Sequence, residues 1–285
     1  SIRAGEMFAL LGPNGSGKTT LFRILSTLLA PSAGTARVGG CDVVGEAMAV
    51  RHQIGVVFQS PALDPQLTVE ENLRCAGNLY GLRGADLAAR GRTAAEALGL
   101  SDRLADRVQS LSGGLQRRVE IAKCLLPRPR VLLLDEPSTG LDPAAREGLR
   151  ATLERVRRES GVTVVMTTHL LEEAERCDRV AILHRGRLVA CETPAELRGR
   201  LGTDVAVVSG PEPESLAARV REMFGWPLSI RGEHLRVEVP AGGDAAGRLV
   251  SALGAAADTV TVGRPTLEDV FLDLTGEPLR GEEEA

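Results

Sequence analysis

No run of apolar residues in the sequence approaches the roughly 20 that are needed to cross a bilayer, so we expect the chain not to span a membrane itself. The start of the chain lacks the basic segment and apolar core that a secretory signal requires. With 285 residues, 43% of them hydrophobic, and a mean hydropathy of -0.01, the sequence predicts a soluble globular protein of one large or two smaller domains. Any role at a membrane would therefore depend on a partner chain.

Paired cysteines are also missing. The five cysteines are widely scattered and include no CxxC pair, which argues against a disulfide framework and against a zinc site. We therefore expect a reducing compartment such as the cytoplasm. The cysteines are Cys41, Cys75, Cys124, Cys177 and Cys191.

The chain has no excess of positive charge either. Its net charge is -4, with a pI near 5.7, which gives no reason to expect a nucleic-acid partner. The charge is uneven, because residues 200–285 hold 8 Arg against 15 Asp and Glu, a net charge of -7, which leaves +3 for residues 1–199. This shift predicts a domain boundary between residues 199 and 200.

Buried strands and amphipathic helices alternate through most of the first 199 residues. This alternation predicts an α/β fold, with a parallel sheet covered by helices. Predicted strands are Phe8–Leu11, Ile54–Phe58, Val131–Leu134, Val162–Met166 and Val180–Leu183, and predicted helices are Gly17–Leu29, Pro143–Glu159 and Leu170–Arg176.

Two other regions have a different pattern. Residues 60–127 are predicted to be an all-helical insertion, with helices at Thr68–Leu79, Ala85–Leu98 and Gly113–Leu126. Residues 200–285 have the order strand, helix, strand, strand, helix, strand, which predicts a ferredoxin-like α+β domain. The strands of that domain are predicted at 204–209, 228–231, 235–239 and 258–262, and its helices at 213–223 and 243–253, followed by Leu267–Leu274.

The segment from Gly12 to Thr19 fits GxxxxGK[ST], directly after a strand and before a helix, which is the context that a phosphate-binding loop requires. Its glycines let successive backbone N–H groups point inward, and the helix adds its positive end. Lys18 is expected to neutralise phosphate charge, and the Thr19 hydroxyl to bind Mg²⁺. The alternative is a glycine-rich turn with a solvated lysine. The predicted phosphate ligands are Gly12, Asn14, Gly15, Ser16, Gly17, Lys18, Thr19 and Thr20.

Asp135 and Glu136 follow the apolar strand Val131–Leu134, at the end where open α/β sheets bind ligands. We expect Asp135 to hold Mg²⁺ and Glu136 to polarise the water that attacks the γ-phosphate. The alternative is that this carboxylate pair caps the next helix.

Gln59 and His169 follow two other strands and should reach the same edge of the sheet. The amide of Gln59 can bind Mg²⁺ or position water, and His169 can sense the γ-phosphate; a structural role for the histidine is the alternative. Ser112, Gly113 and Gly114 begin a predicted helix, and its N–H groups offer a second anion site.

Taken together, these residues resemble the nucleotide-binding subunit of ABC transporters over about residues 1–199. Ser112 precedes Asp135 by 23 positions and Asp135 precedes His169 by 34, spacings typical of that family. The resemblance implies a P-loop NTPase fold, ATP and Mg²⁺ as ligands, and ATP hydrolysis as the activity. The motifs also follow the family's order, which is the phosphate loop, Gln59, Leu111–Gly114, Asp135 and Glu136, Ser138–Asp142, and His169.

The resemblance further implies a dimer, in which two cassettes close head to tail over two nucleotides. Ser112 and Gly114 would contact the γ-phosphate held by the other copy, Glu136 would be the general base, and His169 the switch residue. Asp142 would link the two sites. Hydrolysis would require closure, because only the closed dimer surrounds the transferring phosphoryl group with enough positive charge and dipoles.

The sequence departs from the family pattern at two places. The family commonly reads LSGGQ, whereas Leu115 here occupies the fifth place and Gln116 follows it; drug-resistance exporters often have an apolar residue there. Related cassettes also begin some two dozen residues earlier, with an aromatic residue that stacks on adenine. We therefore expect the N-terminal strands and that aromatic residue to be missing from this chain.

The segment Pro265–Leu272 resembles the accessory domain of daunorubicin-resistance and related ABC-2 exporters. This implies a drug-exporting or antibiotic-resistance ATPase that works at the cytoplasmic face of the membrane with a separate permease, whose helices would contact Ser60–Tyr80. The helix stripe at Leu267, Val270, Phe271 and Leu274 either packs on its own domain or contacts a second copy.

Two alternative functions would require other features in the sequence. A soluble ABC-type ATPase acting in DNA repair or translation would carry long coiled coils in its insertion or two cassettes in one chain, whereas Gln59 and Ser112 are only 53 positions apart and there is one phosphate loop. An importer cassette would carry a β-barrel in place of the ferredoxin-like order.

Overall fold

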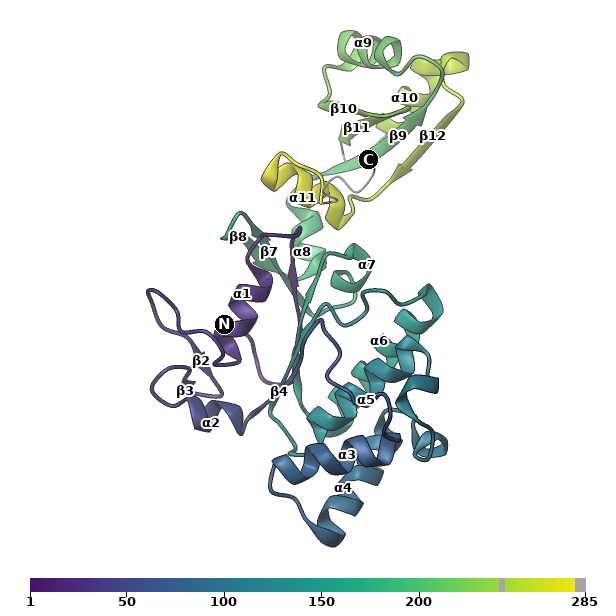
Figure 1. The fold of residues 1–285 in the computed structure, drawn as a ribbon. Coiled ribbons are helices and arrows are strands. Elements are labelled where there is room, and N and C mark those ends of the chain that lie inside the picture. Colours follow the sequence, from purple (N-terminus) through teal and green to yellow (C-terminus); the bar gives the residue numbers. More distant parts are fainter. Residues whose placement is uncertain (241–243, 280–285) are drawn as a thin grey trace. The chain divides into compact units, whose positions relative to one another are not determined.

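The computed structural model describes residues 1–240 and 244–279, which form two compact units (Figure 1). The first unit is Ser1–Thr193 and the second is Pro194–Leu279. The sequence places the boundary after residue 199, six residues later. The difference arises because helix α8 (Pro194–Gly199) contacts α11 (Leu267–Thr275) and so groups with the second unit.

The first unit is built on a six-stranded sheet in the order β4-β5-β6-β1-β7-β8. All neighbouring strands are parallel except β7 and β8, which are antiparallel, so the predicted parallel sheet is confirmed. Strand β8 was not predicted. It forms a hairpin with β7 through Arg185 and Gly186, both with positive φ. The strands are β1 (Met7–Leu11), β4 (Ile54–Val57), β5 (Val131–Asp135), β6 (Thr163–Thr168), β7 (Arg179–His184) and β8 (Arg187–Glu192).

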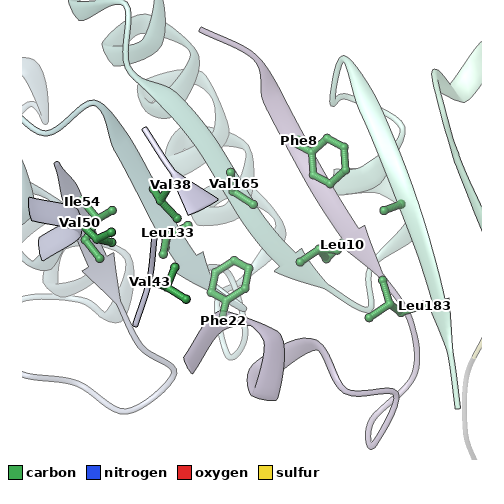
Figure 2. Packing of buried hydrophobic residues seen from close by; sticks show 11 residues of the cluster. Phe8, Leu10, Phe22, Val38, Val43, Val50, Ile54, Leu133, Val165 and Leu183 are labelled. Atoms are coloured by element: carbon green, nitrogen blue, oxygen red, sulfur yellow. The ribbon is translucent and has the colours of Figure 1, made fainter. Parts of the chain in front are cut away.

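Helix α1 (Lys18–Leu25) covers one face of this sheet, and α5 (Gly113–Leu125) and α6 (Pro143–Ser160) lie on the other (Figure 1). Figure 2 shows Phe22 of α1 against side chains from the strands; it is completely buried, which contributes roughly 1.5–3 kcal/mol. The predicted helix Gly17–Leu29 extends four residues too far at its C-terminal end, because the chain turns at Thr27, whose φ is 64°. The hydrophobic core cluster that contains Phe22 consists of Phe8, Leu10, Phe22, Val38, Val43, Val50, Ile54, Leu133, Val165, Ala181 and Leu183.

The predicted helical insertion is observed as three helices, α3 (Val69–Leu79), α4 (Gly84–Ala97) and α5, each within one residue of its predicted bounds. Helix α3 begins with a capping box, in which Thr68 and Glu71 each accept a hydrogen bond from the other's backbone N–H. Before the insertion lie three short elements that were not predicted, β2 (Arg37–Val38), β3 (Cys41–Asp42) and α2 (Ala47–Arg51).

The second unit contains the predicted order β-α-β-β-α-β. Its sheet has the antiparallel order β10-β11-β9-β12, and its core lies between the sheet and the helices α9 and α10. The predicted helix 243–253 begins at Gly243, which lies outside the described residues. The elements are β9 (Thr203–Ser209), α9 (Pro213–Phe224), β10 (Leu228–Arg231), β11 (His234–Pro240), α10 (Ala245–Leu253) and β12 (Thr259–Gly263).

Helix α11 is the last helix in the described part of the chain. Its Asp269 accepts a 2.6 Å hydrogen bond from Nε of Arg236 on β11, and both residues are buried. Leu267, Val270 and Phe271 of the predicted apolar stripe are buried as well, which favours packing within the chain. None of the helices in residues 1–240 and 244–279 is long and apolar enough to cross a membrane.

Candidate nucleotide-binding site

A polar cavity of about 500 Å³ lies at the carboxyl edge of the first unit's sheet, where the loop between β1 and α1 turns. Ten of the predicted site residues line it together with Thr139, which was not predicted. The sheet order brings them together, because β1, β4, β5 and β6 all end at this edge. The lining residues are Asn14, Gly15, Ser16, Gly17, Lys18, Thr19, Thr20, Gln59, Glu136, Thr139 and His169.

The loop after β1 needs its glycines for two reasons. A Cβ on Gly12 would lie 2.4 Å from the Leu183 carbonyl oxygen and 2.7 Å from Oγ of Ser16, so only glycine fits there. Gly15 and Gly17 have φ values of 77° and 99°, which residues other than glycine rarely adopt. The loop therefore has the tight turn that a phosphate cradle requires.

Lys18 is the buried cation of the cavity, with a side chain only 4% exposed. Its Nζ donates to the carbonyl oxygens of Gly12, at 2.7 Å, and Pro13, at 3.0 Å, and lies 3.6 Å from Oε1 of Glu136. Burial lowers the pKa of the Lys18 ammonium, while the charge of Glu136 and a hydrogen bond to it oppose that effect. An anion in the cavity would offset the desolvation of this charge.

A hydroxyl and a carboxylate meet where Mg²⁺ is expected. Oγ1 of Thr19 donates to Oδ1 of Asp135 at 3.4 Å, and Asp135 is buried. Mg²⁺ is usually held by one or two such oxygens together with substrate phosphates and water, so this donor set fits the ion. Within the part of the chain that the structure describes, no group of three or more His, Cys, Asp and Glu residues is arranged to hold a metal by itself.

Glu136 stands at the centre of the polar contacts. Its Oε2 accepts a 3.2 Å hydrogen bond from Oγ1 of Thr139 and lies 3.4 Å from Nδ1 of His169. The alternative in which Asp135 and Glu136 cap the next helix is wrong, because Asp142 is the N-cap of α6 and accepts from the Ala145 N–H at 2.9 Å.

The segment that carries Gln59 is fastened to α5. Nη1 of Arg117 donates to the Phe58 carbonyl at 2.9 Å, and the Ala62 N–H donates to Oε1 of Glu120 at 2.7 Å. Nζ of Lys123 donates to the Ala62 carbonyl. The helix that begins at the predicted second anion site thus also holds the Gln59 segment.

Ser112, Gly113, Gly114 and Asp142 do not line the cavity of their own chain. The first three begin α5, where Ser112 is the N-cap and accepts from the Leu115 N–H. A Cβ on Gly114 would lie 3.1 Å from that of Ala145 on α6.

The side chain of Gln116 turns back toward the loop that precedes α5. Its Nε2 donates to the carbonyl oxygens of Val108, at 3.2 Å, and Leu111, at 3.0 Å. The amide of Gln116 is therefore turned to its own chain and does not take the place of the glutamine that the family commonly has at the position of Leu115.

Two functional candidates were missed from the sequence, Thr139 and Thr167. Thr139 lies three residues after Glu136, in the same turn, so its closeness along the chain could have suggested this contact. Thr167 lies beside Asp135 on the neighbouring strand and bonds to it, which requires knowledge of the sheet order and register.

Comparison with known proteins identifies the family. The family model described as "ABC transporter" matches residues 1–139, and a second model, described as an AAA domain, matches residues 107–175. The linearmycin resistance ATP-binding protein LnrL of Bacillus subtilis is 35% identical over 98% of this chain and 93% of its own length. This chain belongs to the ABC transporter ATP-binding proteins.

The ABC family membership fits both the sequence and the fold. The daunorubicin resistance ATP-binding protein DrrA3 of Streptomyces coeruleorubidus is 40% identical over 100% of this chain and 92% of its own length. A dimeric structure of a post-hydrolysis state of an ATP-binding cassette bound to ADP and Pi has a TM-score of 0.60 and 32% identity, over 68% of this chain and 87% of that one. The chain is therefore an ABC ATPase of the ABC-2 exporter type, from a family whose cassettes bind ATP and work as dimers with a transmembrane partner.

Proposed function

We propose that this ABC ATPase hydrolyses Mg²⁺-bound ATP between two identical copies and thereby drives export through a separate permease. One observation carries the proposal: Glu136 shares a cavity with the phosphate loop, 3.6 Å from Nζ of Lys18 and 3.4 Å from Nδ1 of His169. A carboxylate that lines the same cavity as the phosphate loop is placed to take a proton from a water that attacks a bound phosphate.

The roles of the residues follow from their places. Lys18 and the N–H groups of Gly15, Ser16 and Gly17 would bind the β- and γ-phosphates, together with Asn14 of the loop and Thr20 in the first turn of α1. Gly12 would contribute at the start of the loop, next to these lining residues. Bound Mg²⁺ would neutralise phosphate charge, held by Thr19, Asp135 and Gln59. Glu136 would accept the proton of the attacking water, and His169 would report on the γ-phosphate.

The remaining predicted ligands would act on the partner copy. Ser112, Gly113 and Gly114 lie outside the cavity of their own chain, at the N-terminus of α5, where N–H groups can bind an anion. We propose that they complete the site of the second copy and that Asp142 lies at the link between the two sites. Closure would then supply the last positive dipoles around the transferring phosphoryl group.

The two units would divide this work. We propose residues 1–199 as the cassette, with a helical subdomain at 60–127, and residues 200–285 as an accessory domain. Leu79 and Tyr80 at the end of α3 are 89% and 47% exposed, which supports the segment Ser60–Tyr80 as the contact for the permease. By analogy with relatives named for linearmycin and daunorubicin resistance, the exported compound would be a drug or antibiotic. The protein would work at the cytoplasmic face of the membrane, without a nucleic-acid partner.

The substitution Glu136→Gln tests the proposal. It removes the proton acceptor but keeps the size of the side chain, so ATP binding should persist while turnover falls by about a hundredfold or more. Dimers should accumulate with ATP in light scattering. Glu159→Gln on the exposed end of α6 is the matched control and should hydrolyse ATP like the unchanged protein. Turnover by Glu136→Gln at the unchanged rate would exclude Glu136 as the base.

A further inference from the structure

Thr167 lies in the middle of the first unit's sheet and is completely buried. It is the second-last residue of β6 and stands directly beside Asp135 of β5 in the parallel register. Alternate residues of β6 point to the same face, so Thr167 follows Val165, which belongs to the core cluster of Figure 2. On this face of β6, the apolar side chain of Val165 is thus followed by the hydroxyl of Thr167 where the strand reaches the site.

The hydroxyl of Thr167 bonds to both acidic residues. Its Oγ1 donates to Oδ1 of Asp135 at 2.5 Å and accepts from the backbone N–H of Glu136 at 2.9 Å. A threonine hydroxyl has one proton, and here that proton is committed to the carboxylate. A hydrogen bond of this length to an ionised carboxylate is among the strong ones in proteins, so it fixes the orientation of Asp135.

The second bond supports an unusual backbone conformation. Glu136 has a φ of 46°, in the left-handed region that residues other than glycine seldom adopt. Its N–H is satisfied by the Thr167 hydroxyl. Without that acceptor, a buried donor would remain unpaired at the turn that directs the Glu136 side chain toward Lys18 and His169.

The neighbouring threonines of β6 have other partners. Thr168 donates to Oε2 of Glu173 and accepts from the Leu170 N–H, so it shapes the chain around His169. Thr163, at the start of the strand, accepts from the Gly5 N–H at 3.0 Å. Among these three, Thr167 alone bonds to Asp135 and to Glu136.

We infer that Thr167 is a positioning residue, whose hydroxyl sets the Asp135 carboxylate for Mg²⁺ and holds the Glu136 turn in place for proton transfer. The inference rests on the proposed roles of Asp135 and Glu136. The geometric part concerns only bonds within the chain, so it can be tested without nucleotide.

Thr167→Val is the informative substitution, because valine has the same shape and favours strands but has no hydroxyl. In the nucleotide-free protein, the Glu136 amide should exchange its hydrogen at least about tenfold faster. The kcat for ATP should fall about tenfold or more while KM for ATP changes by less than about threefold, and the Mg²⁺ concentration for half-maximal nucleotide binding should rise severalfold. Thr167→Ser, which keeps the hydroxyl, should restore each quantity to within about threefold of its unchanged value.

Thr163→Val is the control, because it removes a buried hydroxyl from the same strand, far from the site. It should leave kcat and the Glu136 exchange rate unchanged. Equal effects of Thr167→Val and Thr163→Val, or equal impairment by Thr167→Val and Thr167→Ser, would overturn the inference. Failure of the proposed function has a different signature, namely unchanged turnover by Glu136→Gln while exchange at Glu136 still responds to Thr167→Val.

Discussion

Arg117 and Glu120 lie one turn apart on α5 and form a buried ion pair, with 2.7 Å between Nη1 and Oε2. Both groups also bind backbone atoms of the segment after β4, Arg117 through the Phe58 carbonyl and Glu120 through the Ala62 N–H. The pair thus satisfies its own buried charges while it holds the Gln59 segment against the helix that begins at Ser112. Motion of one of these parts must therefore involve the other.

Arg117→Met should destabilise the first unit strongly. It leaves the Glu120 carboxylate buried without its cation, so the free energy of unfolding should fall by about 3–5 kcal/mol in urea titrations. The exposed pair of Arg103 and Asp106 offers the control, and Arg103→Met should cost no more than about 1 kcal/mol. Similar losses for both variants would show that burial adds nothing to the Arg117 pair.

Gly12→Ala should weaken nucleotide binding strongly, because the added methyl group would lie 2.4 Å from the Leu183 carbonyl oxygen and force the loop out of position. We expect the affinity for ATP to fall by about a hundredfold or more, measured with a fluorescent analogue. Gly91→Ala in α4 has open space for its methyl group and should leave binding unchanged, while it stabilises the protein by about 0.5–1 kcal/mol. Tight binding by Gly12→Ala would contradict the cradle geometry.

The buried thiol of Cys124 should make the free energy of unfolding fall as the pH rises into the alkaline range. Burial raises the pKa of its thiol from 9.0 to about 12, so above pH 9 the unfolded chain loses this proton first and the folded state is disfavoured. From pH 8 to pH 10 this group alone should lower the free energy of unfolding by about 1.4 kcal/mol. Urea titrations of Cys124→Ala at both pH values, with a reductant, should show a pH-dependent loss smaller by that amount. An unchanged pH dependence would exclude this thiol as its source.

The sequence predicted the elements that have a strong local pattern. The phosphate loop, the helices of the insertion and the five parallel strands of the first unit's sheet were located within a few residues, because glycine spacing and apolar periodicity are local properties. Ser112 was also placed correctly at the start of a helix, and the structure identifies it as the N-cap.

Features that depend on distant parts of the chain were missed. Strand β8 has exposed Arg187 and Leu188 and is stabilised by pairing with β7, so its own pattern is weak. The bond from Thr167 to Asp135 joins residues 32 positions apart, and only the register of β5 and β6 brings them together. The competing explanation for Asp135 and Glu136 was resolved by Asp142, whose backbone conformation was not visible in the sequence.

Asp142 is the N-cap of α6, and this structural role complicates any experiment on coupling between the two copies of a dimer. Its carboxylate caps the N-terminus of an 18-residue helix, so Asp142→Ala would fray α6 as well as remove the proposed link between the two sites. Asparagine starts helices almost as well as aspartate and has no charge. If Asp142→Asn keeps its helix content but loses the coupling between the two sites, the charge of Asp142 is what the coupling requires.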